Sequence, residues 1–195
     1  MTKYWLLLFV CFLFACKSNQ HKENELIPYK KDINEIIELI VGKKVSSHNK
    51  AALISELFRI KILTPGYPPN MPRPVGSIEL HRLLNFKINQ RNFFDKTDSL
   101  HILSQNEMFK TFQIDRTRLK GIKFISMGDA LKNMKSEKEV PFYEMMIPVF
   151  SSDNKKAYVE WDSSGCGLCG VGTALFLEKI NNKWTIVSEE NIWVS

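Results

Sequence analysis

The chain has 195 residues, a formal net charge of +6 and 44% hydrophobic residues. This length and apolar content suffice for one compact domain with its own core, and no shift in composition marks a second domain.

The N-terminus has the features of an export signal. Lys3 precedes an apolar run from Tyr4 to Phe14, which is too short to span a bilayer as a helix. The run ends in Leu13-Phe14-Ala15-Cys16, and an abruptly polar sequence follows. This order resembles the lipobox of bacterial lipoproteins. The resemblance implies cleavage before Cys16 and lipid on that cysteine, whereas the alternatives are an ordinary secretory peptide or a buried N-terminal helix.

Residues 1–15 are therefore expected to be a signal peptide, and the mature protein to be lipid-anchored to a membrane of the bacterial cell envelope. Several acyl chains are needed for a stable anchor. Cleavage removes Lys3 and leaves 26 basic against 21 acidic side chains, a charge of +5. We expect residues 16–30 to be a flexible tether whose lysines favour anionic headgroups, and residues 31–195 to be a single domain. An exported protein meets little nucleic acid, so no nucleic-acid partner is expected.

The first half of the domain mixes helical patterns with loops. The apolar spacing predicts a helix from Asp32 to Val41, ended by Gly42. Residues 47–63 fit either a helix or a helix that passes into a strand. Residues 64–76 hold five of the eight prolines and predict a long loop, which is either a binding arm or an inert surface excursion.

Three further elements are expected before the C-terminal third. Apolar residues from Ile78 to Ile88 predict a strand. Thr97 or Asp98 could cap a helix that runs to about Lys110 with Leu100 on its apolar side, and a short helix is expected at residues 129–134.

The C-terminal third is rich in β-branched and aromatic residues. Strands are predicted at residues 141–150, 156–161, 173–180 and 184–194. Ser152-Asp153-Asn154 and Asn181-Asn182 are typical of turns between antiparallel neighbours, so the four strands predict an antiparallel meander. We interpret Trp161, Trp184 and Trp193 as packing residues rather than a sugar platform. The pattern indicates an α+β fold with helices on one face of the sheet, and its order resembles the cone-shaped NTF2-like folds.

One motif stands out, the segment Gly165-Cys166-Gly167-Leu168-Cys169-Gly170-Val171-Gly172. In an oxidising compartment Cys166 and Cys169 could close a small disulfide, with the glycines supplying the positive φ angles of a tight ring. A redox pair is the second interpretation, although strand-like sequence follows Cys169 where thioredoxin-like proteins have a helix. A zinc site is the third, and it would need ligands from the scattered His21, His48, His81 and His101.

Other chemistry finds less support in the sequence. The serine-hydrolase elbow, the zinc-protease helix motif and the phosphate-binding loop are all absent from the chain, and no motif predicts a cofactor. Alternation places Glu160 and Asp162 on one sheet face, which we interpret as an ordinary solvated edge.

The stretch from Gly165 to the end, with its final Trp-Val-Ser, resembles the C-terminus of small uncharacterised bacterial lipoproteins. That resemblance implies a shared domain and no activity. The sequence as a whole predicts a binding or accessory module for an envelope protein or a small ligand, with the Cys166–Cys169 loop at the binding edge and residues 65–74 as a second candidate contact. The alternative is a thiol oxidoreductase with Cys166 as nucleophile and Cys169 as resolving partner.

Overall fold

A computed structural model of the chain describes residues 28–45, 51–64, 66–67, 74, 76–134, 141–166 and 169–195. The chain divides into a unit of residues 1–33 and a unit of residues 34–195. The expected signal peptide, Cys16 and most of the expected tether lie outside the described residues. The second unit therefore carries the fold and the site that follow.

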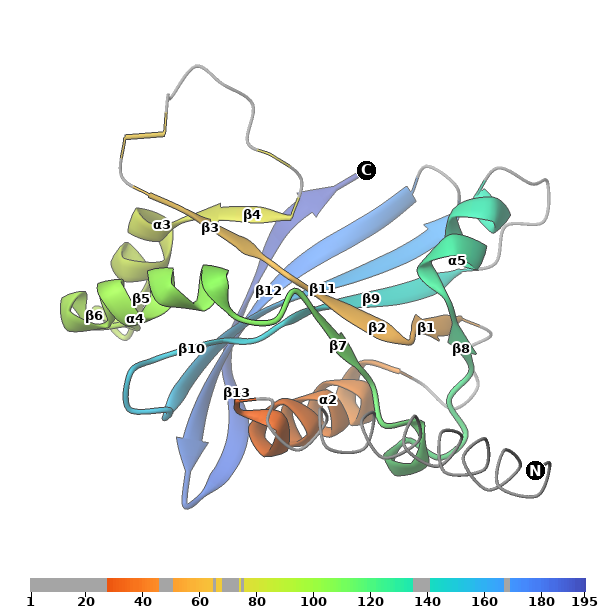
Figure 1. Ribbon diagram of the computed structural model, residues 1–195, viewed down its shortest axis with the longest axis horizontal. Helices are drawn as coiled ribbons and strands as arrows, with labels where there is room; N and C mark the ends of the chain where they lie inside the picture. Colours follow the sequence, from red (N-terminus) through yellow and green to blue (C-terminus); the bar gives the residue numbers. More distant parts are fainter. Residues whose placement is uncertain are drawn as a thin grey trace, which may run out of the picture. The chain divides into compact units, whose positions relative to one another are not determined.

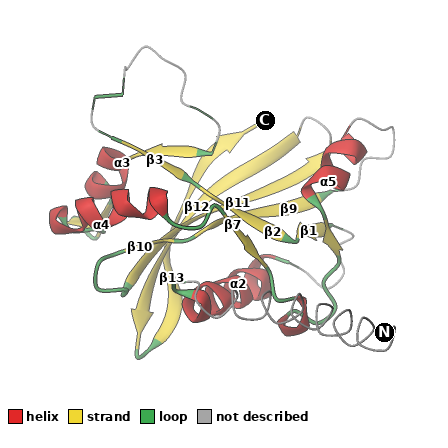
Figure 2. Ribbon diagram, viewed as in Figure 1, coloured by secondary structure: helices red, strands yellow, loops and turns green. Residues whose placement is uncertain are grey.

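Helices and strands are interspersed up to residue 134, and the described residues from 141 onward form strands alone, as Figures 1 and 2 show. The helices are α2 (Lys30–Lys44), α3 (Leu80–Asn85), α4 (Ser99–Ser104) and α5 (Met127–Met134), with 3-10 turns η1 (Lys96–Asp98), η2 (Gln105–Glu107) and η3 (Arg116–Arg118). The strands are β1 (Ala52–Ile54), β2 (Glu56–Arg59), β3 (Lys61–Leu63), β4 (Ser77–Glu79), β5 (Lys87–Ile88), β6 (Arg91–Asn92), β7 (Thr111–Gln113), β8 (Phe124–Ile125), β9 (Phe142–Ile147), β10 (Val149–Phe150), β11 (Lys156–Cys166), β12 (Cys169–Ile180) and β13 (Lys183–Val194). The α+β class expected from the sequence is confirmed.

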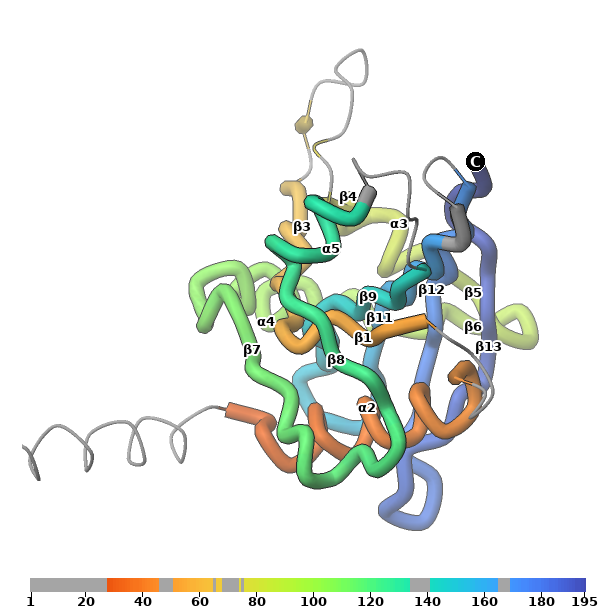
Figure 3. The backbone as a smooth tube through the Cα atoms, turned by 90° about the vertical axis from the view of Figure 1, so that its right-hand side faces the viewer, coloured from red at the N-terminus to blue at the C-terminus, as the bar shows by residue number. Residues whose placement is uncertain are grey.

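The main sheet is mixed, and its strand order is β13-β12-β11-β9-β1-β8. Neighbours from β13 to β9 are antiparallel, whereas β1 is parallel to both β9 and β8. Figure 3 shows β12 and β13 running side by side as the longest pair. Strands from the first half of the domain thus extend the C-terminal strands into one sheet, which the expected order of early helices and late strands did not include.

The C-terminal strands overlap the predicted ranges, but β9 and β10 divide the first range, β11 extends further to Cys166 and β12 begins earlier at Cys169. Asn181 and Asn182 both have positive φ, of 50° and 60°, and they close the turn between β12 and β13. Asparagine tolerates this backbone region, which two-residue hairpin turns of this kind require at both positions. Asn154 has a φ of 55° in the turn that joins β10 to β11. Both predicted turns are therefore confirmed.

The first half of the domain departs from prediction at two places. Helix α2 continues through Gly42 to Lys44, because two lysines in its last turn favour the helix dipole and Lys44 pairs with Glu189 at 2.5 Å. The undecided stretch 47–63 contains β1, β2 and β3 in its described residues, so a helix there is wrong. The alternation of Phe58, Ile60 and Ile62 marks those strands better than the helical spacing does.

The structure also corrects two predictions for residues 78–107, the segment that contains α3 and α4. Residues 78–88 are mainly helix α3 between two short strands, so the predicted single strand is wrong. The helical segment begins one turn earlier than predicted, at η1, where the side chain of Asp95 accepts from the backbone N–H of Thr97. Asp98 is the N-cap residue of α4, as predicted, but its side chain accepts from the backbone N–H of Asp95 and makes no capping bond to α4. This segment ends at Glu107, and Leu100 is 80% exposed, while Ile102 is the buried residue of α4.

One face of the sheet packs against α3 and α4. Its strand residues are Tyr158, Ala174 and Phe176, and the cluster that they share with the helices also contains Leu80, Leu83, Phe93, Phe94 and Ile102. The opposite face buries Val159, Trp161 and Leu175, as strand alternation requires. Near the Cys166 end of β11 the first face is left uncovered by this cluster, and the cavity described next lies there.

Candidate functional site

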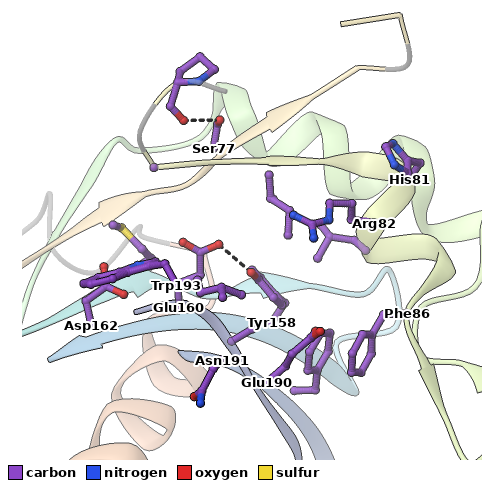
Figure 4. A pocket seen from close by; sticks show the side chains of 18 of the residues that line it. Ser77, His81, Arg82, Phe86, Tyr158, Glu160, Asp162, Glu190, Asn191 and Trp193 are labelled. Carbon is purple, nitrogen blue, oxygen red and sulfur yellow. Dashed lines mark hydrogen bonds between the residues drawn. The ribbon is translucent and has the colours of Figure 1, made fainter. Parts of the chain in front are cut away.

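A cavity of about 710 Å³ lies between α3 with β4 on one side and strands β9, β11, β12 and β13 on the other. Such a volume is within the usual range for small-molecule sites. Its lining residues are Pro74, Gly76, Ser77, Ile78, His81, Arg82, Leu83, Asn85, Phe86, Glu144, Met146, Tyr158, Glu160, Asp162, Ala174, Phe176, Glu190, Asn191, Ile192 and Trp193. Figure 4 shows Arg82 reaching from α3 over Tyr158 of the sheet, whereas His81 lies further away at the edge of the view.

Strand register brings the acidic side chains of the cavity together. Asp162 on β11 lies directly opposite Glu144 on β9, so both side chains point to the same face, with Cβ atoms roughly 4.5–5.5 Å apart. Glu160 lies two residues along β11 on that face. The prediction that Glu160 and Asp162 share a face holds, but the interpretation as a solvated edge is wrong, because both line the cavity and Asp162 is half-buried.

The two opposed carboxyl groups have perturbed proton affinities. Burial, with the neighbouring Asp162 charge, raises the pKa of Glu144 to about 7. Burial likewise raises the pKa of Asp162 to about 6, against the hydrogen bond that Trp193 donates. The cause is desolvation, which disfavours the charged form of a carboxyl group. This pair can therefore take up or release a proton near neutral pH.

The indole ring of Trp193 approaches β12 closely at two glycines. A Cβ atom at Gly172 would sit 2.0 Å from Nε1 of Trp193, and one at Gly170 would sit 2.8 Å from Cη2. Trp193 pairs with Gly172 across β12 and β13 and is hydrogen-bonded to the side chain of Asp162. These two glycines thus serve close approach of the indole ring, whereas the sequence prediction assigned them to the turn of a disulfide ring.

One oxygen of Asp162 lacks a partner. Its Oδ1 atom is buried, and the described part of the chain supplies it with no hydrogen bond. An unpaired buried carboxylate oxygen loses hydration without compensation, and this is costly. A donor placed beside Oδ1 would relieve that cost.

A second hydrogen-bonded group lies further along the cavity floor. The hydroxyl of Tyr158 donates to Oε1 of Glu160 at 2.7 Å, as Figure 4 shows. Burial and the carboxylate of Glu160 raise the pKa of Tyr158, and the charge of Arg82 opposes them. The phenol therefore remains a neutral donor. Next to it, the rings of Phe86 and Phe176 stack with centroids 3.6 Å apart and form an apolar wall.

The cysteine pair lies at the end of the hairpin that carries Asp162. Cys169 is disulfide-bonded, and the backbone register sets it opposite Cys166. Strand β12 begins at Cys169, so no helix dipole acts on this residue. The loop is thus a neighbour of the cavity along β11 and β12.

The remaining sequence candidates are dispersed. His81 lines the cavity and lies 3.2 Å from Glu79, and His101 belongs to α4. His21 and His48 lie outside the described residues. Among the residues that the structure describes, no group of three or more His, Cys, Asp or Glu side chains could hold a metal ion.

The proline-rich segment and the three tryptophans are the other features that the sequence singled out, and the structure treats them differently. Pro74 lines the cavity, whereas Pro65, Pro68, Pro69 and Pro72 lie outside the described residues. Trp161 and Trp184 are buried, which confirms them as packing residues, but Trp193 is 41% exposed at the cavity. Sequence reasoning missed Glu144 altogether, because only the pairing of β9 with β11 sets it against Asp162.

The described residues contain no helix long and apolar enough to cross a membrane. Comparison with protein-family models, with curated proteins and with solved structures finds no match to this chain.

Proposed function

We propose that this protein is a lipid-anchored binding module of the bacterial cell envelope, and that its ligand is a small molecule held in the cavity between α3 and the sheet. Anchoring rests on the lipobox resemblance of Leu13-Phe14-Ala15-Cys16. Binding rests on the cavity, whose floor carries a buried oxygen of Asp162 to which no described residue donates a hydrogen bond. That orphaned acceptor is the observation that carries the proposal, since a folded protein gains nothing by burying it unless a donor arrives.

We also propose that the fold is an NTF2-like cone. In an NTF2-like cone, helices lean on a curved sheet and leave a pocket between them. The cavity beneath α3 and β4 supports that arrangement here. A fold of this kind hosts many activities, so the site residues and not the fold must identify the ligand.

We further propose that Cys166 and Cys169 form a structural staple at the end of the β11–β12 hairpin. The disulfide state of Cys169 and its place at the start of a strand support a staple over redox exchange or metal binding. The staple would fix the hairpin that presents Asp162 and Gly172 to the cavity. An envelope protein that docks on this hairpin end is the alternative partner.

A cavity-blocking variant tests the binding proposal. Ser77 lines the cavity from β4, so Ser77→Trp should fill its opening. Ser104 is exposed on α4 away from the cavity, and Ser104→Trp is the matched control. A fragment set of cationic, neutral and anionic compounds is screened for its effect on Tm of the full-length protein in detergent.

We expect some fragments to raise Tm of the wild type and of Ser104→Trp, because a ligand that binds only the folded state stabilises it. The same fragments should leave Ser77→Trp unchanged. Stabilisation that persists in Ser77→Trp would place binding elsewhere, and a set without any stabilising fragment would contradict a small-molecule site.

A further inference from the structure

We infer that the cavity binds an organic ammonium ion, an amine whose charged head lies between Glu144 and Asp162 and whose apolar body lies along the wall of Phe86 and Phe176. This inference rests on the proposed function, because it assumes that the cavity holds a ligand. It adds the ligand's chemical class, which the charges and contacts of the lining residues indicate.

The ionisable side chains of the lining favour a cation. Among the described residues that line the cavity, four carry carboxyl groups, namely Glu144, Glu160, Asp162 and Glu190, whereas Arg82 carries a guanidinium and His81 an imidazole. His81 already lies 3.2 Å from Glu79. Carboxylates in a partly desolvated site attract positive charge more strongly than they would in water. An anionic ligand would meet net repulsion there.

The Glu144–Asp162 pair is the place within the cavity where a donor is missing. Glu160 accepts from Tyr158, and Asp162 is hydrogen-bonded to Trp193 through its side chain. Oδ1 of Asp162 has no partner in the described part of the chain, and Glu144 lies directly across from it. An ammonium group brings both a positive charge and up to three N–H donors to such a pair.

A metal ion fits this position less well than an amine. A divalent cation needs several protein ligands, and no suitable group of three His, Cys, Asp or Glu occurs among the described residues. A neutral alcohol would supply a donor but no charge. The remaining competitor is the proton, because the same pair binds protons near neutral pH.

The apolar part of the lining indicates that the rest of the ligand is apolar. Leu83 of α3 and Phe86, the residue that follows α3, face Ala174 and Phe176 of β12 within the cavity and its core cluster. About 710 Å³ is more space than an ammonium head alone can fill. The ligand is therefore an amine with an apolar or aromatic body, and not a small inorganic cation.

Three probes that share one body and differ in the head group test this inference. They are 4-phenylbutylamine, 4-phenylbutanol and 4-phenylbutyrate, titrated into full-length protein that carries 5-fluorotryptophan. The fluorine signal of Trp193, assigned with Trp193→Phe, reports on the cavity because the indole lines it beside Asp162. At pH 8 the amine should shift this signal and bind at least about tenfold more tightly than the alcohol, the size of a charge-assisted hydrogen bond.

Variants of the two carboxyl residues and a change of pH then test whether Glu144 and Asp162 bind the amine. Glu144→Gln and Asp162→Asn should each weaken amine binding at least about tenfold. Glu107→Gln removes the same charge at an exposed position and should bind like the wild type. At pH 5 amine binding should weaken in the wild type, since protons then occupy the pair. Glu160, Glu190, Tyr158, Arg82 and His81 also face this region, so the pH effect must shrink in Glu144→Gln to support the inference.

The outcomes separate this inference from the proposed function. If the alcohol or the carboxylate binds as tightly as the amine, or if both carboxyl variants bind normally, an ammonium ligand is overturned while small-molecule binding stands. If no probe shifts the Trp193 signal, the ammonium ligand is also overturned, and the Ser77→Trp fragment screen decides the proposed function separately.

Discussion

At the scale of single residues, the Glu144 and Asp162 side chains reduce the stability of the fold, because two carboxyl groups lie next to each other in a partly desolvated position. Opposed residues on antiparallel strands contact each other whether or not their charges suit. Like charges at such positions destabilise a sheet, and burial adds a desolvation cost. A protein that keeps this arrangement gains something else from it, and the binding of a proton or a cation is what the geometry allows.

Stability should therefore depend on pH through Glu144. Its pKa is raised from 4.5 to about 7 on folding, so the folded state holds the proton more tightly than the unfolded state does. The stabilising contribution is complete below about pH 4.5 and is lost as pH rises through about 7, with a total on the order of 3 kcal/mol. We expect Glu144→Gln to remove this decrease in the free energy of unfolding as pH rises.

The measurement is Tm at pH 5 and pH 8 for the wild type, Glu144→Gln and Glu107→Gln. At pH 8 Glu144→Gln should melt roughly 6–12 °C above the wild type, and at pH 5 the difference should fall to roughly a quarter of that. Glu107→Gln should follow the wild type. A Glu144→Gln protein that parallels the wild type at both pH values would show that Glu144 does not carry the proton.

Gly172 is a second residue on which the site depends. A Cβ atom there would lie 2.0 Å from Nε1 of Trp193, so Gly172→Ala must displace the indole ring. We expect a loss of about 1–3 kcal/mol in the free energy of unfolding, typical of overpacking, together with a changed fluorotryptophan signal. Gly42→Ala is the control, because its Cβ meets nothing within 4 Å. Equal behaviour of the two variants would refute the role of Gly172.

At the scale of elements, the β11–β12 hairpin connects the cysteine loop to the cavity floor. Its register sets Cys166 opposite Cys169 at one end and Asp162 opposite Gly172 a few residues further along. A disulfide at the end of a hairpin restrains strand separation there. The proposed staple would therefore support the geometry of Asp162 and Trp193.

Removing both cysteines should reveal that restraint. A disulfide that closes a loop of about four residues contributes about 2 kcal/mol in the chain-entropy account. Cys166→Ser with Cys169→Ser should thus lower Tm by several degrees, and reductant should affect the wild type but not the double variant. A double variant of unchanged Tm, in a protein whose wild type reduces and reoxidises with a thiol substrate, would favour the oxidoreductase alternative.

Local patterns explain which elements the sequence could predict. Asn181-Asn182 and Ser152 to Asn154 are turn sequences with strands on both sides, so β11, β12 and β13 are encoded within short windows. Residues 78–88 could not be assigned in this way, since Ile78, Leu80 and Leu83 are buried by packing on the sheet rather than by a local period. Tertiary contacts decide such segments.

The candidate site was harder to predict than the strands. Asp162 and Glu160 were visible as acidic neighbours of the cysteine motif, but Glu144 belongs to another strand, and its position depends on register. The role of Gly172 depends on Trp193, which enters from the last strand of the sheet. Such pairings are non-local, so composition and spacing could not show them.

At the scale of the whole molecule, we propose that the N-terminal cysteine attaches the protein to a membrane and that the domain binds the ligand in its cavity. Lys17 and Lys22 belong to the expected tether, and Lys30 and Lys31 follow at the start of α2; their charges favour an anionic membrane surface. A binding domain held near a membrane samples ligands that pass through the envelope. We therefore propose that the anchor matters for function as well as for location.

Two cysteine variants test the anchor. Cys16→Ser should abolish lipid attachment and cleavage, so the protein should keep residues 1–15 and lack acyl chains. Cys11→Ser lies inside the apolar run and should be processed normally. Mass spectrometry of the N-terminal peptide distinguishes the two. A Cys16→Ser protein that is still lipidated, or cleaved at another position, would contradict the lipobox assignment.

The central claim is that the cavity holds a small molecule in the native envelope, and native mass spectrometry tests it most directly. The full-length protein is purified in mild detergent from membranes of cells that make it naturally, together with Ser77→Trp produced in the same cells. The account predicts an added small-molecule mass on the wild type that is absent from Ser77→Trp. Identical bare masses for the two proteins, or the same added mass on both, would contradict it.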